Sequence, residues 1–174
     1  MKPLPCAAGS MMNGGCAMRR WMMGSEIELT LSPQGAEFIA RFEGFRAEPY
    51  FCLAGKRTIG YGHVIRNGEG LSHVTEGEAL DLLTMDATRE AAPVRKALTR
   101  QPNPHEADAL ISLAFNCGGN AIAKSTAVKA FNAGQWATAS DAILIWDKIG
   151  GKTSKGLARR RKAERQLFIS GAYE

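Results

Sequence analysis

The sequence is dominated by one stretch, RFEGFRAEPYFCLAGKRTIGYGH, which occupies residues 41–63. Glu43 ends an amphipathic run, Cys52 follows nine positions later, and Thr58 comes six positions after Cys52. Residues 50–66 alternate β-forming side chains with glycine, which favours a small antiparallel sheet or hairpin. We therefore expect an acid, a thiol and a hydroxyl around the junction between a helix and a small sheet.

A helix is predicted immediately before this stretch. Ser32 and Pro33 make a strong helix start, with serine as the N-cap and proline at the first helical position. The apolar stripe that follows at helical spacing consists of Phe38, Ile39 and Phe42. The helix is expected to end near Gly44, which places Glu43 at its C-terminal end.

The rest of the chain reads as mainly helical. The capping box TEGE at residues 75–78 predicts a long helix to about Leu98, which Pro93 should kink or split. Further helices are expected from Asn103-Pro104 to Gly118-Gly119 and over residues 125–133, 135–146 and 156–169. This order predicts an α+β fold with a small antiparallel sheet lobe and a larger helical lobe. The long helix should join the two lobes, with a cleft between them.

The composition describes a basic globular domain. The chain has 174 residues, of which 45% are hydrophobic and 22% charged, with a formal net charge of +5. This length suits one domain, and the composition is not that of a disordered chain. A basic surface suits an anionic partner such as nucleic acid, anionic lipid or a bacterial cell wall. Charge alone does not choose among these partners.

The cysteines and histidines do not follow the spacing of a metal site. Cys6, Cys16, Cys52 and Cys117 form no CxxC pair, and the three histidines lack zinc-finger spacing. We therefore expect no metal and no cofactor. No run of residues approaches the roughly 18 apolar positions that a membrane span needs.

Residues 1–29 look different from the rest of the chain, because they show little periodicity. We expect an N-terminal tail here, either disordered or a degenerate membrane anchor, and a folded domain over residues 30–174. The segment lacks the continuous apolar stretch of about 7–15 residues that a signal peptide needs. A misplaced start codon is a further interpretation, because Met22-Met23 would begin a plausible shorter protein.

The stretch 41–63 resembles the catalytic stretch of phage-type lysozymes, the endolysins of glycoside hydrolase family 24. That family has Glu, then Asp or Cys, then Thr at this spacing. The resemblance implies a lysozyme-like two-lobed α+β fold and catalytic roles for Glu43, Cys52 and Thr58. His63 matches the family's TIGxGH segment. We group it with the substrate-binding candidates, and favour an orienting or structural hydrogen bond over direct catalysis.

Two downstream segments extend the resemblance. AFNCG at residues 114–118 and KST at 124–126 resemble the part of the family's second lobe that faces the saccharide. By that match Phe115 and Thr126 are substrate-lining candidates. GLARRRKAER at residues 156–165 resembles the family's terminal helix, from which one arginine should approach the catalytic glutamate. Arg160 is our candidate for that arginine.

The implied chemistry is hydrolysis of a glycosidic bond. It needs a proton donor for the leaving oxygen and a second group that activates water or bonds to the anomeric carbon. Glu43 suits the donor role, because partial negative charge at a helix C-terminus favours a protonated carboxyl group. Cys52 stands where many members have Asp, and its thiolate could act as base or nucleophile, so the stereochemistry stays open. Thr58 would hold the attacking water by its hydroxyl.

The resemblance implies a muramidase that hydrolyses the β-1,4 bond between N-acetylmuramic acid and N-acetylglucosamine and thereby lyses bacteria. One alternative is a lysozyme fold that binds peptidoglycan without cleaving it. Another is a basic nucleic-acid binder using the helix Arg159–Arg165, but stacking aromatics are scarce there, so no nucleic-acid partner is expected. We expect a monomer, made in the host cytoplasm, that acts on peptidoglycan in the periplasm or cell wall by an unspecified export route.

The catalytic stretch is also similar to that of signal-anchor-release endolysins. In those proteins a membrane-tethered form is held inactive through a disulfide with the catalytic cysteine. Here Phe45 occupies the nearby position, so that particular lock is absent. Cys6 or Cys16 could take its place, and membrane contact through residues 1–25 is the accompanying hypothesis.

Overall fold

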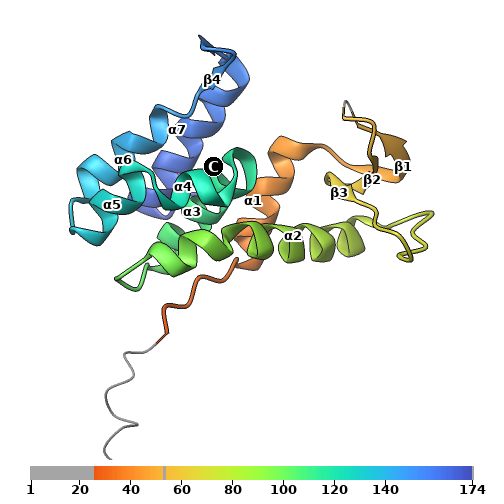
Figure 1. The fold of residues 1–174 in the computed structure, drawn as a ribbon, viewed down its shortest axis with the longest axis horizontal. Helices are drawn as coiled ribbons and strands as arrows, with labels where there is room; N and C mark the ends of the chain where they lie inside the picture. The colour runs from red at the N-terminus through yellow and green to blue at the C-terminus, as the bar shows by residue number, and fades with distance from the viewer. Residues whose placement is uncertain (1–25, 53, 174) are drawn as a thin grey trace, which may run out of the picture.

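The computed structural model describes residues 26–52 and 54–173, which fold into a sheet lobe and a helical lobe (Figure 1). The sheet lobe contains three antiparallel strands in the order β1-β2-β3: β1 (Arg46–Phe51), β2 (Arg57–Gly60) and β3 (His63–Val64). The described helices are α1 (Pro33–Glu43), α2 (Glu76–Ala97), α3 (Pro104–Cys117), α4 (Gly119–Ala123), α5 (Thr126–Asn132), α6 (Trp136–Leu144) and α7 (Lys155–Ser170). A second hairpin pairs β4 (Lys148–Ile149) with β5 (Lys152–Thr153).

The start of α1 is fixed by two polar side chains. Ser32 Oγ accepts a hydrogen bond from the Gly35 N–H at 2.9 Å, which satisfies one of the free amides of the first turn. Asp108, buried in α3, accepts from the Ser32 N–H at 2.8 Å and from the Tyr173 hydroxyl at 2.6 Å. One buried carboxylate therefore joins α1, α3 and the segment that follows α7.

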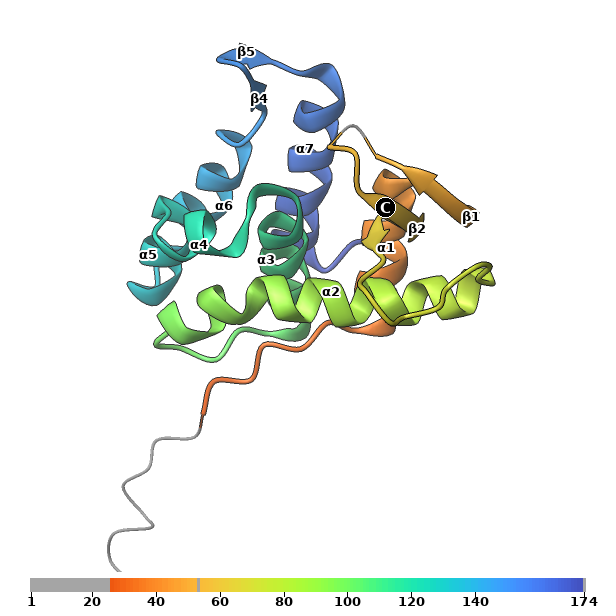
Figure 2. The same cartoon turned by 45° about the vertical axis from the view of Figure 1, so that its right-hand side comes forward.

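The long helix α2 connects the two lobes, as expected. Its capping box is formed, because the Thr75 N–H donates to Glu78 Oε2 at 2.8 Å and Thr75 Oγ1 accepts from the Glu78 N–H. The helix passes through Pro93 without being split. Ala91 and Val94 beside the proline are buried in the core, and this packing offsets the hydrogen bond that proline cannot make. Figure 2 shows α2 running from the sheet lobe to the helical lobe.

The contact between α2 and α4 is unusually close. The Gly119 N–H donates to Glu90 Oε1 at 2.9 Å, so the first turn of α4 rests on α2. A Cβ atom at position 119 would lie 1.8 Å from the Glu90 carbonyl oxygen and 3.2 Å from Pro93 Cδ. Only glycine permits this approach of one backbone to another.

The core lies mainly in the helical lobe. Every residue from 106 to 114 in α3 is buried, because α1, α2, α4 and α7 pack around this helix. Phe131 of α5 and Phe168 of α7 meet edge to face with ring centroids 6.2 Å apart. The sheet lobe has a smaller apolar cluster, centred on Ile59, Val74 and Ala79. Residues 41–63 run from one cluster to the other, since Phe42 packs against the helical core and Ile59 belongs to the sheet-lobe cluster.

Some boundaries differ from those expected. The first strand begins at residue 46 rather than 50, and neither α4 nor the β4–β5 hairpin was expected. Leu29 is buried in the core and the Glu28 N–H donates to Gln101 Oε1 at 2.9 Å, so packing begins before residue 30. Among the helices described here, none is both long and apolar enough to cross a membrane. The hypotheses on Cys6, Cys16 and residues 1–25 lie outside the described residues.

Candidate active site

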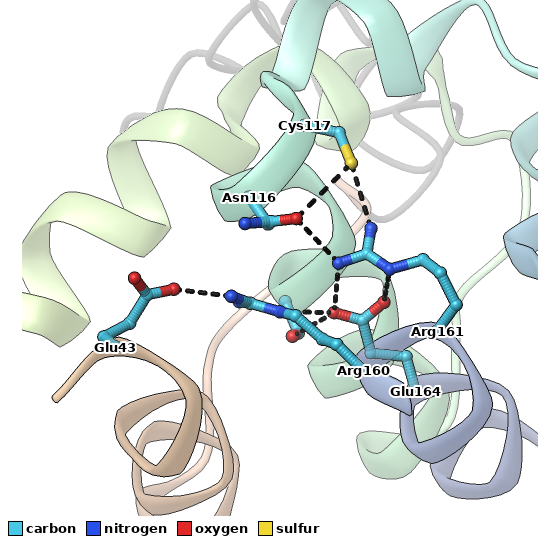
Figure 3. Close-up of polar contacts among 7 residues, drawn as sticks. Glu43, Asn116, Cys117, Arg160, Arg161 and Glu164 are labelled. Carbon is cyan, nitrogen blue, oxygen red and sulfur yellow. Dashed lines mark hydrogen bonds and ion pairs between the residues drawn. The ribbon is translucent and has the colours of Figure 1, made fainter. Parts of the chain in front are cut away.

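Glu43 lies at the last position of α1, where the sequence predicted it. Gly44 ends the helix with a φ of 73°, and its N–H donates to the Ala40 carbonyl. Arg160 Nη1 donates to Glu43 Oε1 at 2.6 Å, across 117 positions of sequence (Figure 3). The expectation that an arginine of the terminal helix approaches Glu43 therefore agrees with the geometry, and that arginine is Arg160.

Arg160 is held by a buried polar network that the sequence did not reveal. Its Nε donates to Glu164 Oε1 at 3.1 Å, and the guanidinium carbon lies 5.2 Å from the centroid of the Phe42 ring. Glu164 also accepts from Ser112 Oγ at 2.7 Å and pairs with Arg161 at 3.0 Å. Figure 3 shows this chain of contacts between α1, α3 and α7.

Arg161 anchors the network to the end of α3. This arginine is fully buried, and its Nη2 donates to Asn116 Oδ1 at 2.8 Å while its Nη1 donates to Cys117 Sγ at 2.9 Å. Burial raises the pKa of the Cys117 thiol, an effect that Arg161 only partly opposes. Cys117 is therefore a neutral acceptor beside Arg161.

The sequence spacing of these charged residues would predict an exposed helix face. Arg160, Arg161 and Glu164 are three and four positions apart on a helix, a spacing typical of solvent-exposed ion pairs. The structure buries all three, because α7 packs against α3 and α6. Charge spacing alone could not distinguish these two placements.

Cys52 occupies a tight turn between β1 and β2. Its N–H donates to the Lys56 carbonyl at 3.0 Å, and the Gly55 N–H donates to the Cys52 carbonyl at 2.8 Å. Gly55 has a φ of 70°, a conformation that favours glycine. Hydrogen bonds from the backbone of Lys56 and Ala54 lower the pKa of the half-exposed Cys52 thiol. The turn therefore favours the thiolate.

Thr58 lies beside this turn but is only 2% exposed. Its Oγ1 donates to the Lys56 carbonyl at 3.0 Å. The hydroxyl has a single hydrogen, so it can hold a water only by accepting a hydrogen bond while this contact is present. The geometry adds a role that was not expected, since Thr58 supports the backbone turn that carries Cys52.

His63 is not available to a saccharide. It is 2% exposed, with Nδ1 2.8 Å from Asp86 Oδ2 and Nε2 3.0 Å from Glu69 Oε2. Both ring nitrogens are occupied, so the geometry favours the expected orienting hydrogen-bond role over contact with substrate. Burial lowers the pKa of His63, but the hydrogen bonds and charges of Glu69 and Asp86 outweigh this and raise it overall.

A cavity of about 360 Å³ opens between the lobes. Phe115 of α3 lines it, opposite Lys56, Gly62 and Val64 of the sheet lobe, and α2 closes one side. Phe115 thus lies where a substrate-lining residue was expected. Thr126 is exposed in the first turn of α5, and it is not among the residues that line this cavity.

Glu43, Cys52 and Arg160 are not among the residues that line this cavity, but two lining residues, Lys56 and Phe115, lie next to their contacts. Lys56 accepts from the Cys52 N–H, and Asn116, next to Phe115, accepts from Arg161 of the Glu43 network. Within residues 26–52 and 54–173, no three His, Cys, Asp or Glu side chains are grouped to hold a metal ion.

Comparison with known proteins shows the family to which this chain belongs. A family model described as phage lysozyme matches residues 40–164. This chain belongs to the phage lysozyme family. It is 35% identical over 145 residues to an endolysin of Bacillus phage B103, covering 82% of this chain and about half (55%) of that relative. A SAR-endolysin of Escherichia phage Mu is 31% identical over 135 residues, covering 77% of this chain and 78% of its own length.

Solved structures agree with this membership. The endolysin from Escherichia coli O157:H7 phage FAHEc1 is similar with a TM-score of 0.75 and 33% identity, covering 86% of this chain and 99% of that one. The expectations of a phage-lysozyme family and a lysozyme-like α+β fold are therefore confirmed. As a phage lysozyme, the protein is a glycoside hydrolase of the peptidoglycan-hydrolysing muramidase type.

Proposed function

We propose that this protein is an endolysin that hydrolyses the β-1,4 bond between N-acetylmuramic acid and N-acetylglucosamine, with Glu43 as general acid. The observation that carries the residue assignment is the Glu43–Arg160 pair, which joins the last position of α1 to the terminal helix α7. Glu43 is 23% exposed at its side chain, so the carboxyl group is reachable by a substrate while one oxygen stays paired. This exposure suits a group that must hand a proton to a leaving oxygen.

The reaction divides between the two lobes. Glu43 donates its proton to the glycosidic oxygen, and the carboxylate that results is stabilised by Arg160. The Cys52 thiolate takes a proton from the attacking water or bonds to the anomeric carbon itself, and the backbone donors of its turn favour that anionic form. These two routes give opposite anomers, so product stereochemistry distinguishes them.

The setting of the enzyme follows from its substrate. Action on the peptidoglycan of the cell wall agrees with endolysin relatives, and the SAR-endolysin of phage Mu supports an export step. Synthesis in the host cytoplasm, a monomeric state, no nucleic-acid partner and membrane contact through residues 1–25 are part of the proposal. So is the division into an N-terminal tail, first set at residues 1–29, and a catalytic domain first set at residues 30–174, with the boundary moved to before Glu28 because Glu28 and Leu29 already contact the domain.

The decisive experiment is Glu43→Gln, which keeps the side-chain volume but removes the donated proton. Clearing of purified walls should fall by a factor of about 100 or more, since general acid catalysis contributes that much. Thermal melting of the variant should show a folded protein. Mass spectrometry of digested walls should find reducing muramic acid ends with the parent enzyme. Activity within a few-fold of the parent would contradict the role of Glu43, and wall binding without products would favour the non-catalytic alternative.

A further inference from the structure

One buried carboxylate near the active site has no part in the reaction described above. Glu164 is 0% exposed and lies one turn after Arg160 on α7. Ser112 Oγ, Arg160 Nε and Arg161 Nη2 donate to its Oε1 at 2.7, 3.1 and 3.2 Å. A carboxylate removed from water in this way persists only where charges and hydrogen bonds compensate it. Its burial therefore calls for a reason beyond stability, because apolar side chains commonly pack such a position better.

The charges of the cluster depend on the protonation of Glu43. Two guanidiniums, Arg160 and Arg161, face two carboxylates, Glu43 and Glu164. Arginine does not deprotonate in proteins, so only the carboxylates can change the balance. The cluster is neutral when Glu43 is ionised and carries one positive charge when Glu43 is protonated.

The other groups around the cluster do not alter this count. From α3 it is faced by the Ser112 hydroxyl, the Asn116 amide and the Cys117 thiol, and from α1 by the Phe42 ring. The thiol stays neutral, because burial raises its pKa. Burial also raises the pKa of Glu164, and the two arginines and Ser112 oppose that effect. Glu164 pairs with both guanidiniums, so its ionised form balances one of their two positive charges.

We propose that Glu164 is a positioning residue for the general acid, which holds the Arg160 guanidinium against Glu43 and offsets the charge of the arginine pair. This inference rests on the proposed role of Glu43. Arg160 binds Glu164 through Nε and Glu43 through Nη1, so one planar guanidinium bridges both carboxylates in a fixed orientation. Without Glu164, two guanidiniums would act on Glu43 alone and favour its ionised form across a wider pH range.

The same arrangement assists proton transfer. As Glu43 gives up its proton, the cluster passes from one net positive charge to neutrality, so the negative charge that develops on Glu43 meets a preformed partner. Glu164 keeps that partner from binding Glu43 too strongly beforehand. Glu164 therefore sets how strongly Arg160 binds Glu43 before and after the proton is transferred.

The test changes the charge of the cluster in both directions. Glu164→Gln should move the alkaline limb of the pH profile of kcat/KM to lower pH by about one unit. Arg161→Met should move it to higher pH, and the combined variant, which removes one charge of each sign, should leave it near the parent. Glu164→Asp, which keeps the charge, should restore the position of the limb. Asp141→Asn is the matched control, because Asp141 is an exposed carboxylate paired with Arg165 on α7.

A second measurement separates this inference from the proposed function. The titration of Glu43 followed by 13C NMR of glutamate-labelled protein should shift with the same signs in the same variants. A Glu43→Gln enzyme with parental activity would remove the general-acid role itself. Unchanged Glu43 titration in Arg161→Met and in every folded Glu164 variant would overturn the inference and leave Glu164 as a packing group. The Arg161→Met and combined variants keep the test decisive if Glu164→Gln does not fold.

Discussion

At the scale of single residues, the two reactive side chains are prepared by different means. Glu43 is oriented by a side chain from the far end of the chain, whereas Cys52 is prepared by the backbone of its own turn. Lowering the pKa of a thiol by amide donors has a direct consequence for the pH range of activity. A thiolate base is present only above its pKa, so the lowered pKa extends to lower pH the range in which the base is available.

Substitution of Cys52 tests this consequence. Cys52→Asp should retain activity and extend it to lower pH, because an ordinary aspartate titrates near 3.9 and an ordinary thiol near 8.5. Cys52→Ser should lose activity by a factor of about 100 or more, because a hydroxyl is not ionised at neutral pH. The measurement is the pH profile of wall clearing, with melting temperature as the folding check. A serine variant as active as the parent would make the thiol structural.

The residues of the sequence motifs could be predicted, but the residues that hydrogen-bond to them could not. Glu43, Cys52 and Arg160 follow from resemblance to one family, and the catalytic role of each remains a prediction. The partner of His63 was not predicted, because nothing in the sequence links His63 to Asp86, 23 positions away. Glu164 was missed because its spacing from two arginines is that of an exposed helix face.

At the scale of secondary structure, capping signals predicted the long elements well. Ser32-Pro33 and the capping box at Thr75 mark the starts of α1 and α2 as the structure has them. Helix α4 has five residues, and strands β4 and β5 have two residues each. Elements this short show no hydrophobic periodicity in the sequence. Pro93 was expected to interrupt α2, but tertiary packing overrode the local preference.

The contact between α2 and α4 gives a test at this scale. Gly119→Ala should lower the free energy of unfolding by about 1–3 kcal/mol, because a methyl group there would overlap the Glu90 carbonyl. Gly77→Ala in the first turn of α2 is the matched control, since no atom lies within 4 Å of its added Cβ. The control should be neutral or stabilising by up to about 1 kcal/mol. Denaturant unfolding measures both, and equal effects would rule out the steric explanation.

At the scale of the whole molecule, His63 ties the sheet lobe to α2 and to the loop that contains Glu69. Its pKa is raised in the folded protein, so the stabilisation it provides is complete below the ordinary histidine pKa. That stabilisation is lost as pH rises through the raised value. His63→Asn should therefore lower the free energy of unfolding most near pH 5–6 and less at higher pH. The loss near pH 5–6 should be about 3 kcal/mol, the size expected when one partner of a buried ion pair is removed.

Unfolding curves from pH 5 to pH 9 check this dependence. His73→Asn, at an exposed position of the same lobe, is the control and should change stability little at any pH. A pH-independent loss in the His63 variant would mean that His63 contributes through packing rather than charge.

The Glu43–Arg160 contact also bears on how the enzyme reaches its active form. It joins residues 117 positions apart, whereas the hydrogen bonds within α2 are local. Contacts between distant parts of a chain carry a larger loop-closure cost and tend to form after local ones. An intermediate with both lobes partly built would lack the arginine beside its acid. We therefore predict that hydrolytic competence appears only once the terminal helix has docked against α3.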